Sequence, residues 1–338
     1  MSRGRPTAME GEGTSGACAL VAAAMLTVLA LPACGDSSAA LEPPPDAHAG
    51  HAIKHVVVVA LENADATSVY TGADWQYVRD GLLPQAARAL AFQDELGAGL
   101  PSEPHYIWME AGTNVFADHT FTTDDPPSAS NSTEDPDHLV TQLAQAETGA
   151  DWMSYQEGIG AATGACPITE DGFYRPRHDP FVFFRDVAGS PPSETAATCA
   201  AHHRPLSALS GDLASGDVSA YVFITPNLCH SGHGQSGCPN DNTQQSADQW
   251  LSESLPSLIA FANAQDGVVF LVWDEGANGQ LLPFIAVGSH VKAGYASSVS
   301  YSHSSLLKSL EEIFGLPILP TVTTASDFSD LFEAGSFP

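Results

Sequence analysis

The sequence predicts an α/β domain with a mostly parallel central sheet and helices on both faces. Short apolar runs rich in β-branched residues recur at positions 56–61, 218–224 and 268–273, as expected for strands buried on both faces. Segments with helical spacing lie between these runs, which is the alternation typical of parallel α/β folds. The runs end in polar residues such as Glu62 and Asp274, at the edge where open α/β sheets bind ligands.

The remaining elements follow in order along the chain. The run 56–61 is too short for most helices, so it is predicted to be the central strand. A short helix is expected within 100–114, between two prolines and a Gly-Thr-Asn turn, and an acidic loop at 120–137. Apolar runs predict further strands at 91–96, 151–156 and 283–287, and helical spacing predicts helices at 75–92, 138–145, 246–262 and 304–314.

Length and charge restrict the function classes. The 338 residues are enough for one large α/β domain or two ordinary ones. Lys and Arg number 11 against 40 Asp and Glu, for a formal net charge of −29. Such a surface repels phosphate backbones, which excludes nucleic acid as the main partner. Carboxylates also supply oxygen ligands for hard cations, although most of them are expected simply to be solvated.

Residues 1–34 are predicted to be a lipoprotein signal peptide. The apolar run 17–31 has the length of a signal-peptide core and is short for a membrane span. It ends in Leu-Pro-Ala-Cys-Gly, which resembles a bacterial lipobox with Cys34 as the lipidated residue. We therefore expect an exported protein that meets the membrane only through a lipid anchor on the cell envelope. Ordinary secretory cleavage nearby, which would release the protein, is the alternative.

One domain is expected to follow a tether. Residues 35–50 are rich in Pro, Ala, Ser and Asp without apolar periodicity, which is typical of a flexible tether. No later segment has this composition, so residues 51–338 are predicted to form one domain.

Four cysteines follow the predicted signal peptide, and export favours their oxidation. They allow three connectivities. We predict the nearest-neighbour pairing, Cys166–Cys199 and Cys229–Cys238, in which each bond closes a loop. A cysteine-based zinc site is the alternative, and the lack of a Cys-x2-Cys pair in the sequence argues against it.

Six motifs occur in order: HVVVVALEN, PSEPHYIWMEAGTN, RHDPFVFF, ITPNLCHSGH, WDEG and YSHSSLLKSLEEIFG. Each motif is weak alone, but six in order are specific. Together they resemble the bacterial phosphoesterase family that holds acid phosphatases and phospholipases C, within the alkaline phosphatase superfamily. The resemblance spans residues 53–316 and implies an alkaline-phosphatase-like α/β fold.

The resemblance implies a divalent metal site at the carboxyl edge of the sheet. Its ligands would be Glu62 and Asn63 after the first strand, and Asp274 and Glu275 after a later one. Hard cations prefer such oxygen ligands, and a cation there neutralises phosphate charge. The metal could be Ca²⁺, Mg²⁺, Mn²⁺ or Zn²⁺. Solvated strand ends are the simpler alternative for each pair taken alone.

The resemblance also implies a Ser or Thr nucleophile that becomes transiently phosphorylated. Thr113 is the candidate, because Gly-Thr-Asn matches the small-hydroxyl turn of the family, and Asn114 would hydrogen-bond the same phosphate oxygens. A hydroxyl at a helix start has backbone N–H groups nearby. Ser102 is the reserve nucleophile, and a plain helix cap is the alternative role for Thr113.

Three histidines match family positions: His178, His233 and His303. A histidine can protonate a leaving alkoxide or donate to the transferring oxygens. The sequence departs from the family at His105, where Asn is usual, and His105 is a candidate additional ligand or acid. It departs again at 230–234, where two polar or acidic positions beside His233 are lost.

These observations predict an exported, metal-dependent phosphoesterase that acts on a phosphorylated small molecule. Phosphomonoester hydrolysis through a phosphorylated Thr is preferred. A phospholipase C-like phosphodiesterase is the first alternative, and the altered segment 230–234 favours a second, a lipoprotein that binds metal or phosphate without turnover. A sulfatase-like enzyme is disfavoured because the sequence has no Cys-x-Pro-x-Arg run.

Overall fold

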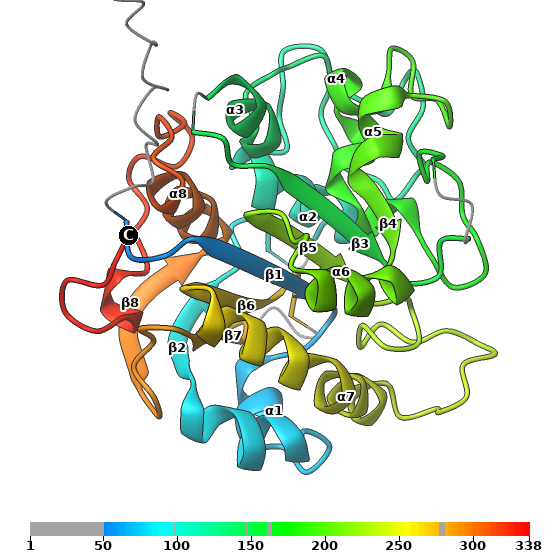
Figure 1. The fold of residues 1–338 in the computed structure, drawn as a ribbon. Helices are drawn as coiled ribbons and strands as arrows, with labels where there is room; N and C mark the ends of the chain where they lie inside the picture. The colour runs from blue at the N-terminus through cyan, green and yellow to red at the C-terminus, as the bar shows by residue number, and fades with distance from the viewer. Residues whose placement is uncertain (1–50, 98, 147, 161–163, 277–280) are drawn as a thin grey trace, which may run out of the picture. The chain divides into compact units, whose positions relative to one another are not determined.

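A single mixed sheet runs through the described part of the chain (Figure 1). The computed structural model describes residues 51–97, 99–146, 148–160, 164–276 and 281–338. The predicted signal peptide, the lipidation site Cys34 and the tether at 35–50 lie outside these residues. No helix within the described ranges is both long and apolar enough to span a membrane.

The sheet has eight strands in the order β4-β3-β5-β1-β6-β7-β2-β8. Only β7 is antiparallel to its neighbours among these strands, so the predicted mostly parallel sheet is confirmed. The strands are β1 (His55–Leu61), β2 (Ala87–Gln93), β3 (Trp152–Gln156), β4 (His203–Pro205), β5 (Tyr221–Thr225), β6 (Gly267–Trp273), β7 (Phe284–Gly288) and β8 (Ala296–Ser302).

Strand β1 lies inside the sheet, between β5 and β6. Its residues from Val56 to Leu61 are all buried, which explains the continuous apolar run. Alternate side chains enter different cores: Val56 and Val58 belong to one, Val57 and Val59 to the other. The predicted central strand is therefore confirmed.

Helices cover both faces of the sheet (Figure 1). Helices α2, α3 and α8 contribute to the core around Val56 and Val58. Helices α1 and α7 contribute to the opposite core. The helices are α1 (Ala66–Thr71), α2 (Ser102–Ala111), α3 (Leu139–Gln145), α4 (Arg185–Ala188), α5 (Ala197–His202), α6 (Leu209–Ser215), α7 (Thr243–Ala264) and α8 (His303–Ile313).

The helix predicted at 75–92 is wrong beyond residue 85. A π-helical turn at Tyr77–Leu82 passes into a 3₁₀ turn at Leu83–Gln85, and strand β2 begins at Ala87. Pro84 lacks the N–H that a continuing helix needs, so the helical pattern ends there. The strand predicted at 91–96 consequently starts and ends earlier, at Ala87–Gln93.

Both edge strands, β4 and β8, are absent from the sequence-based prediction. Strand β8 reads Ala-Ser-Ser-Val-Ser-Tyr-Ser and pairs only with β2 in the described sheet. An edge strand with one solvated face contains no continuous apolar run, so it lacks the signal that revealed the central strands.

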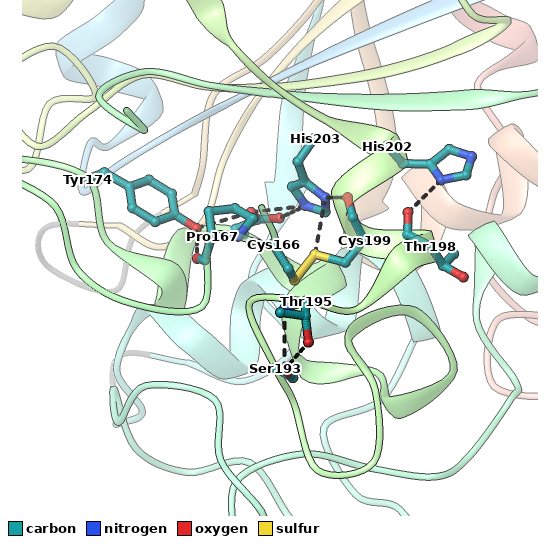
Figure 2. The surroundings of a disulfide bond; sticks show 10 residues. Cys166, Pro167, Tyr174, Ser193, Thr195, Thr198, Cys199, His202 and His203 are labelled. Atoms are coloured by element: carbon teal, nitrogen blue, oxygen red, sulfur yellow. Dashed lines mark hydrogen bonds and ion pairs between the residues drawn. A yellow bond between two sulfur atoms is a disulfide. The ribbon is translucent and has the colours of Figure 1, made fainter. Parts of the chain in front are cut away.

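The four cysteines pair as predicted, Cys166 with Cys199 and Cys229 with Cys238. Figure 2 shows the first bond beside His203, whose Nδ1 lies 3.4 Å from Cys199 Sγ. His203 also contacts the buried Asp179 at 3.2 Å. This disulfide therefore fastens a loop-rich segment to the start of β4.

Candidate active site

The carboxyl ends of β1 and β6 bring two acidic residues side by side. Leu61 and Trp273 are paired in the parallel register, so the residues that follow, Glu62 and Asp274, leave the sheet together. Asp274 donates its backbone N–H to Leu61 O at 3.0 Å, and its Oδ1 accepts from Asn63 N–H at 3.2 Å. Asn63 has φ of 52°, a left-handed conformation that Asn adopts more readily than most residues.

The Glu62 carboxylate is fully buried and surrounded by donors. Tyr106 donates its hydroxyl to Oε1 at 2.7 Å. Ser102 donates its hydroxyl to Oε2 at 3.1 Å. His178 Nε2 lies 3.1 Å from Oε1. Helix α2 and the 3₁₀ turn that ends at His178 therefore hold this carboxylate together.

The carboxyl groups of Asp274 and Glu275, next to Glu62, have raised pKa values. Burial, followed by the charges of Glu62 and Glu275, raises the pKa of Asp274 well above its ordinary value. Burial raises the pKa of Glu275 to about 7, against the lowering effect of His105. Asp274 Oδ2 has no hydrogen-bond partner among the described residues. Crowded carboxylates with an unpaired buried oxygen fit a hard divalent cation, which would neutralise them.

Ser102 occupies the first position of α2, with its hydroxyl buried beside Glu62. The start of a helix of ten residues carries partial positive charge that favours anions. One carboxylate already binds at this helix start: Asp124 Oδ1 accepts a hydrogen bond from Glu103 N–H at 3.1 Å. A phosphate group at Ser102 would meet the same field.

Thr113 does not begin a helix, contrary to the expectation of a hydroxyl at a helix start. Helix α2 ends at Ala111, and Gly112 terminates it in a left-handed conformation with φ of 63°. A helix rises about 1.5 Å per residue, so Thr113 lies roughly 15 Å further along the chain direction than Ser102. The structure does not bring Thr113 to the carboxylates.

Thr113 and Asn114 instead shape the loop after α2. Thr113 Oγ1 accepts from Val115 N–H at 3.0 Å. Asn114 is buried, and its Nδ2 donates to Phe121 O at 2.8 Å. These contacts give both residues a structural role at the far end of the helix.

The loop after β5 closes against Glu62. Glu62 donates its backbone N–H to Ser231 O at 2.9 Å. Gly232 has φ of 104°, and a Cβ there would lie 2.7 Å from Glu62 O. Only glycine fits this approach without displacement. The altered segment 230–234 therefore forms part of the site despite its departure from the family.

His178 and His233 lie together, with ring centroids 5.9 Å apart. Burial, followed by the charge of Arg177, lowers the pKa of His178 well below its ordinary value. The neutral ring that this favours lies close to Glu62 and can act as a positioning group, although Nε2 makes no hydrogen bond there among the described contacts. His233 is partly buried, and its Nδ1–H donates to Gly234 O at 2.7 Å, which leaves Nε2 for chemistry.

His303 and His105 lie on another side of these acids. His303 begins α8 and donates its Nε2–H to Trp273 O at 2.9 Å, directly before Asp274. Among the described residues, the group of at least three His, Cys, Asp or Glu side chains with ligand atoms within 4.8 Å of one another is Asp94, His105 and His303. The ligand atoms of the predicted set Glu62, Asp274 and Glu275 are not all within 4.8 Å of one another by the same measure.

Comparison with known proteins decides the family. The model of the Phosphoesterase family matches residues 75–317, well over half of the chain. The chain belongs to the phosphoesterase family. It is therefore a hydrolase that acts on phosphoric esters, as the six motifs predict.

Two relatives of this phosphoesterase are phosphatases by name. The chain is 25% identical over 280 residues to a phosphatidylinositol-3-phosphatase of Mycobacterium tuberculosis, and the match covers 82% of each protein. It is 24% identical over 283 residues to a probable acid phosphatase of Kluyveromyces lactis, covering 80% of this chain and 60% of that protein.

Solved structures support the alkaline-phosphatase-like fold. The lipoteichoic acid synthase LtaP of Listeria monocytogenes matches with a TM-score of 0.52 and 13% identity, covering 85% of this chain and 78% of that one. A protein in the alkaline phosphatase superfamily from Vibrio parahaemolyticus matches with a TM-score of 0.50 and 10% identity, covering 80% and 68%. At these identities the likeness shows the fold alone.

Sequence reasoning missed several residues of the site. Tyr106 was not singled out, although it lies four residues after Ser102 and therefore on the same face of α2. Ser231 acts through its backbone oxygen, which no side-chain pattern reveals. Asp94 directly follows β2, but the strand predicted at 91–96 placed it inside the strand and not at its end.

Proposed function

We propose that this phosphoesterase is an exported, metal-dependent phosphomonoesterase that uses Ser102, in place of Thr113, as its nucleophile. The observation that carries the proposal is the position of Ser102. Its buried hydroxyl lies at the start of α2 and donates to Glu62, beside Asp274. This arrangement joins a hydroxyl, a field that favours anions and a set of acidic ligands.

Glu62, Asn63, Asp274 and Glu275 would hold the metal. When bound, a divalent cation offsets the negative charge of the phosphate and of these carboxylates. Its expected ligands are oxygen atoms, which favours a hard cation such as Ca²⁺, Mg²⁺ or Mn²⁺ over Zn²⁺. Ser102 contacts Oε2 of Glu62, whereas Tyr106 and His178 contact the other carboxylate oxygen, Oε1.

The chain's own groups account for the chemistry. The Ser102 hydroxyl is hydrogen-bonded to the Glu62 carboxylate and passes its proton to it while Oγ attacks phosphorus. The bond from phosphorus to the leaving oxygen breaks, and that oxygen takes a proton from His233 in its imidazolium form. Water then attacks the phosphoserine and gives a proton to the neutral His233. The bond from phosphorus to Ser102 Oγ breaks, Oγ takes back the proton held on Glu62, and phosphate leaves.

Three observations support the remaining parts of the proposal. Both named relatives are phosphatases, which favours monoesters over the phospholipase C-like alternative. Two disulfides favour an oxidising compartment outside the cytosol. The lipobox-like sequence at Cys34 favours a lipid anchor on the cell envelope.

The proposal is tested with a chromogenic phosphate monoester and a matching diester, before and after chelation. We expect the monoester to be the better substrate, and chelation to abolish activity until a divalent cation is restored. Asp274→Asn should lower kcat by at least about a hundredfold, whereas the exposed Asp241→Asn serves as the matched control. Activity that survives exhaustive chelation would contradict the metal requirement, and a folded protein inactive on both esters would favour the non-catalytic alternative.

A further inference from the structure

We propose that Asp94, His105 and His303 form a second cation site, suited to a borderline divalent transition ion such as Zn²⁺. The proposal goes beyond the phosphomonoesterase chemistry, because none of the steps assigned to Ser102 and His233 requires a second ion.

Three elements distant in sequence bring these side chains together. Asp94 directly follows β2, His105 lies in the first turns of α2, and His303 is the first residue of α8. One ligand atom from each lies within 4.8 Å of the others, and His105 Nδ1 is already 3.1 Å from Asp94 Oδ1. Ligands of a tetrahedral zinc ion are about 3.3 Å apart, so a small closure of the side chains would complete the site.

Two of the three residues have buried atoms without hydrogen-bond partners. His105 is fully buried. Its Nε2 has no hydrogen-bond partner within the described ranges, and neither has Asp94 Oδ2. Leaving such atoms unpaired costs free energy. The ion pair between His105 and Asp94 accounts for one nitrogen and one oxygen; a bound ion would account for the remaining atoms.

The surroundings orient His303 as a ligand. Its Nε2–H donates to the backbone oxygen of Trp273 at 2.9 Å, so Nδ1 is the nitrogen that would bind the ion, in place of its contact with Glu95 at 3.6 Å. Imidazole ligands of metals commonly donate their other N–H to a carbonyl or carboxylate in this way. Asp94 is held similarly, because its Oδ1 accepts from Leu96 N–H at 2.9 Å.

Glu95 completes the support of this site. Its Oε1 accepts from Ser304 N–H at 2.9 Å, and its Oε2 accepts from His303 N–H at 3.2 Å. These bonds fasten the start of α8 to the end of β2, so the positions of Asp94 and His303 depend on one another. Glu95 Oε2 lies 3.6 Å from His303 Nδ1.

The donor set distinguishes the proposed ion from the one at Glu62 and Asp274. Two imidazoles and one carboxylate suit zinc and similar ions, whereas carboxylates and an amide suit hard ions. Asp94 also lines a cavity of about 730 Å³ between α1 and β2.

Metal binding by the purified full chain tests the proposal without measuring activity. After chelator treatment, Zn²⁺ is titrated into the protein, and bound metal is measured by elemental analysis after equilibrium dialysis. Co²⁺ is used in parallel, since nitrogen ligands give it a distinct visible absorption. We expect His105→Asn to weaken Zn²⁺ binding at least tenfold and to remove the Co²⁺ band.

His290→Asn is the matched control, because His290 is 37% exposed and lies outside both sites. Asp94→Asn is the second variant if His105→Asn fails to fold, as judged by thermal unfolding. Asp274→Asn should keep the Zn²⁺ site, which separates it from the site of the proposed phosphomonoesterase. Wild-type Zn²⁺ affinity in folded His105→Asn, or Zn²⁺ binding that Asp274→Asn alone abolishes, would overturn the proposal.

Discussion

The two ends of helix α2 are built from similar residues but have different surroundings. At the N-terminal end, Ser102 lies buried against Glu62. At the C-terminal end, Thr113 bonds only to its own loop in the contacts that the structure describes. Both are small hydroxyl residues beside a helix terminus, so the type of residue does not distinguish them. What distinguishes them is the sign of the helix field and the neighbouring strand end.

The direction of the helix explains the difference. The N-terminal end favours a phosphate anion, while the C-terminal end presents carbonyl oxygens that repel it. This contrast is the reason for proposing Ser102 as the nucleophile. The three predictions that follow test this contrast between the ends of α2.

The largest effect is expected from the two hydroxyl residues. Ser102→Ala should lower kcat for a chromogenic monoester by at least about a thousandfold, because it removes the attacking oxygen. Thr113→Ala should change kcat by less than about twofold, since it alters only a loop hydrogen bond. Steady-state kinetics on the folded variants and trapping of the phosphorylated residue measure the difference. An inactive Thr113→Ala protein beside an active Ser102→Ala protein would reverse the assignment.

A smaller effect, on stability alone, is expected at the C-terminal end. Gly112 is left-handed, and a Cβ there would lie 2.4 Å from Val322 Cγ1. Gly112→Ala should therefore reduce the free energy of unfolding by about 3 kcal/mol, from backbone strain and overpacking. Urea unfolding measures this loss, and activity per folded molecule should be unchanged.

The matched control for this variant is Gly216, which ends α6 in the same left-handed conformation with open space around it. Gly216→Ala should cost only about 1 kcal/mol, from the backbone alone. Equal losses in the two variants would show that the contact with Val322 contributes nothing.

The third effect, a change in the pH dependence of stability with no change in catalysis, concerns Glu110 in the last turn of α2. This side chain is buried and accepts a hydrogen bond from the Tyr221 hydroxyl. Burial raises the pKa of Glu110 from 4.5 to about 8. The folded protein thus keeps a proton that the unfolded chain releases, so this contribution to stability is full below pH 4.5 and is lost as pH rises to about 8.

Glu110→Gln should remove that dependence. The unfolding free energy should then fall less steeply with pH, by up to about 1.4 kcal/mol per pH unit. Urea unfolding across this window measures the slope. The exposed Glu333→Gln should leave the slope as in the wild type. An unchanged slope in Glu110→Gln would show that Glu110 is ionised throughout.

Much of the fold follows from the sequence because buried strands leave a strong signal. The run at 56–61 and the run at 268–273 predict β1 and β6, and the polar residues after them lead to Glu62 and Asp274. The edge strand β8 escapes prediction because its serines carry no apolar pattern. The helix at 75–92 was extended too far because the alternating β2 also contains helix-favouring residues such as Ala and Arg.

The site was harder to predict than the fold. The order of motifs identifies the segments that meet, but it does not show which end of α2 faces the acids. Tyr106 and the backbone of Ser231 contribute through contacts across the fold, and such contacts leave no local pattern. The position of Ser102 beside Glu62 in the structure is the basis for proposing it in place of Thr113.

The pairing of Leu61 with Trp273 has a consequence for engineering. Deleting one residue within β1 would shift the register, exchange its two buried faces and separate Glu62 from Asp274. These strands therefore tolerate little change in length.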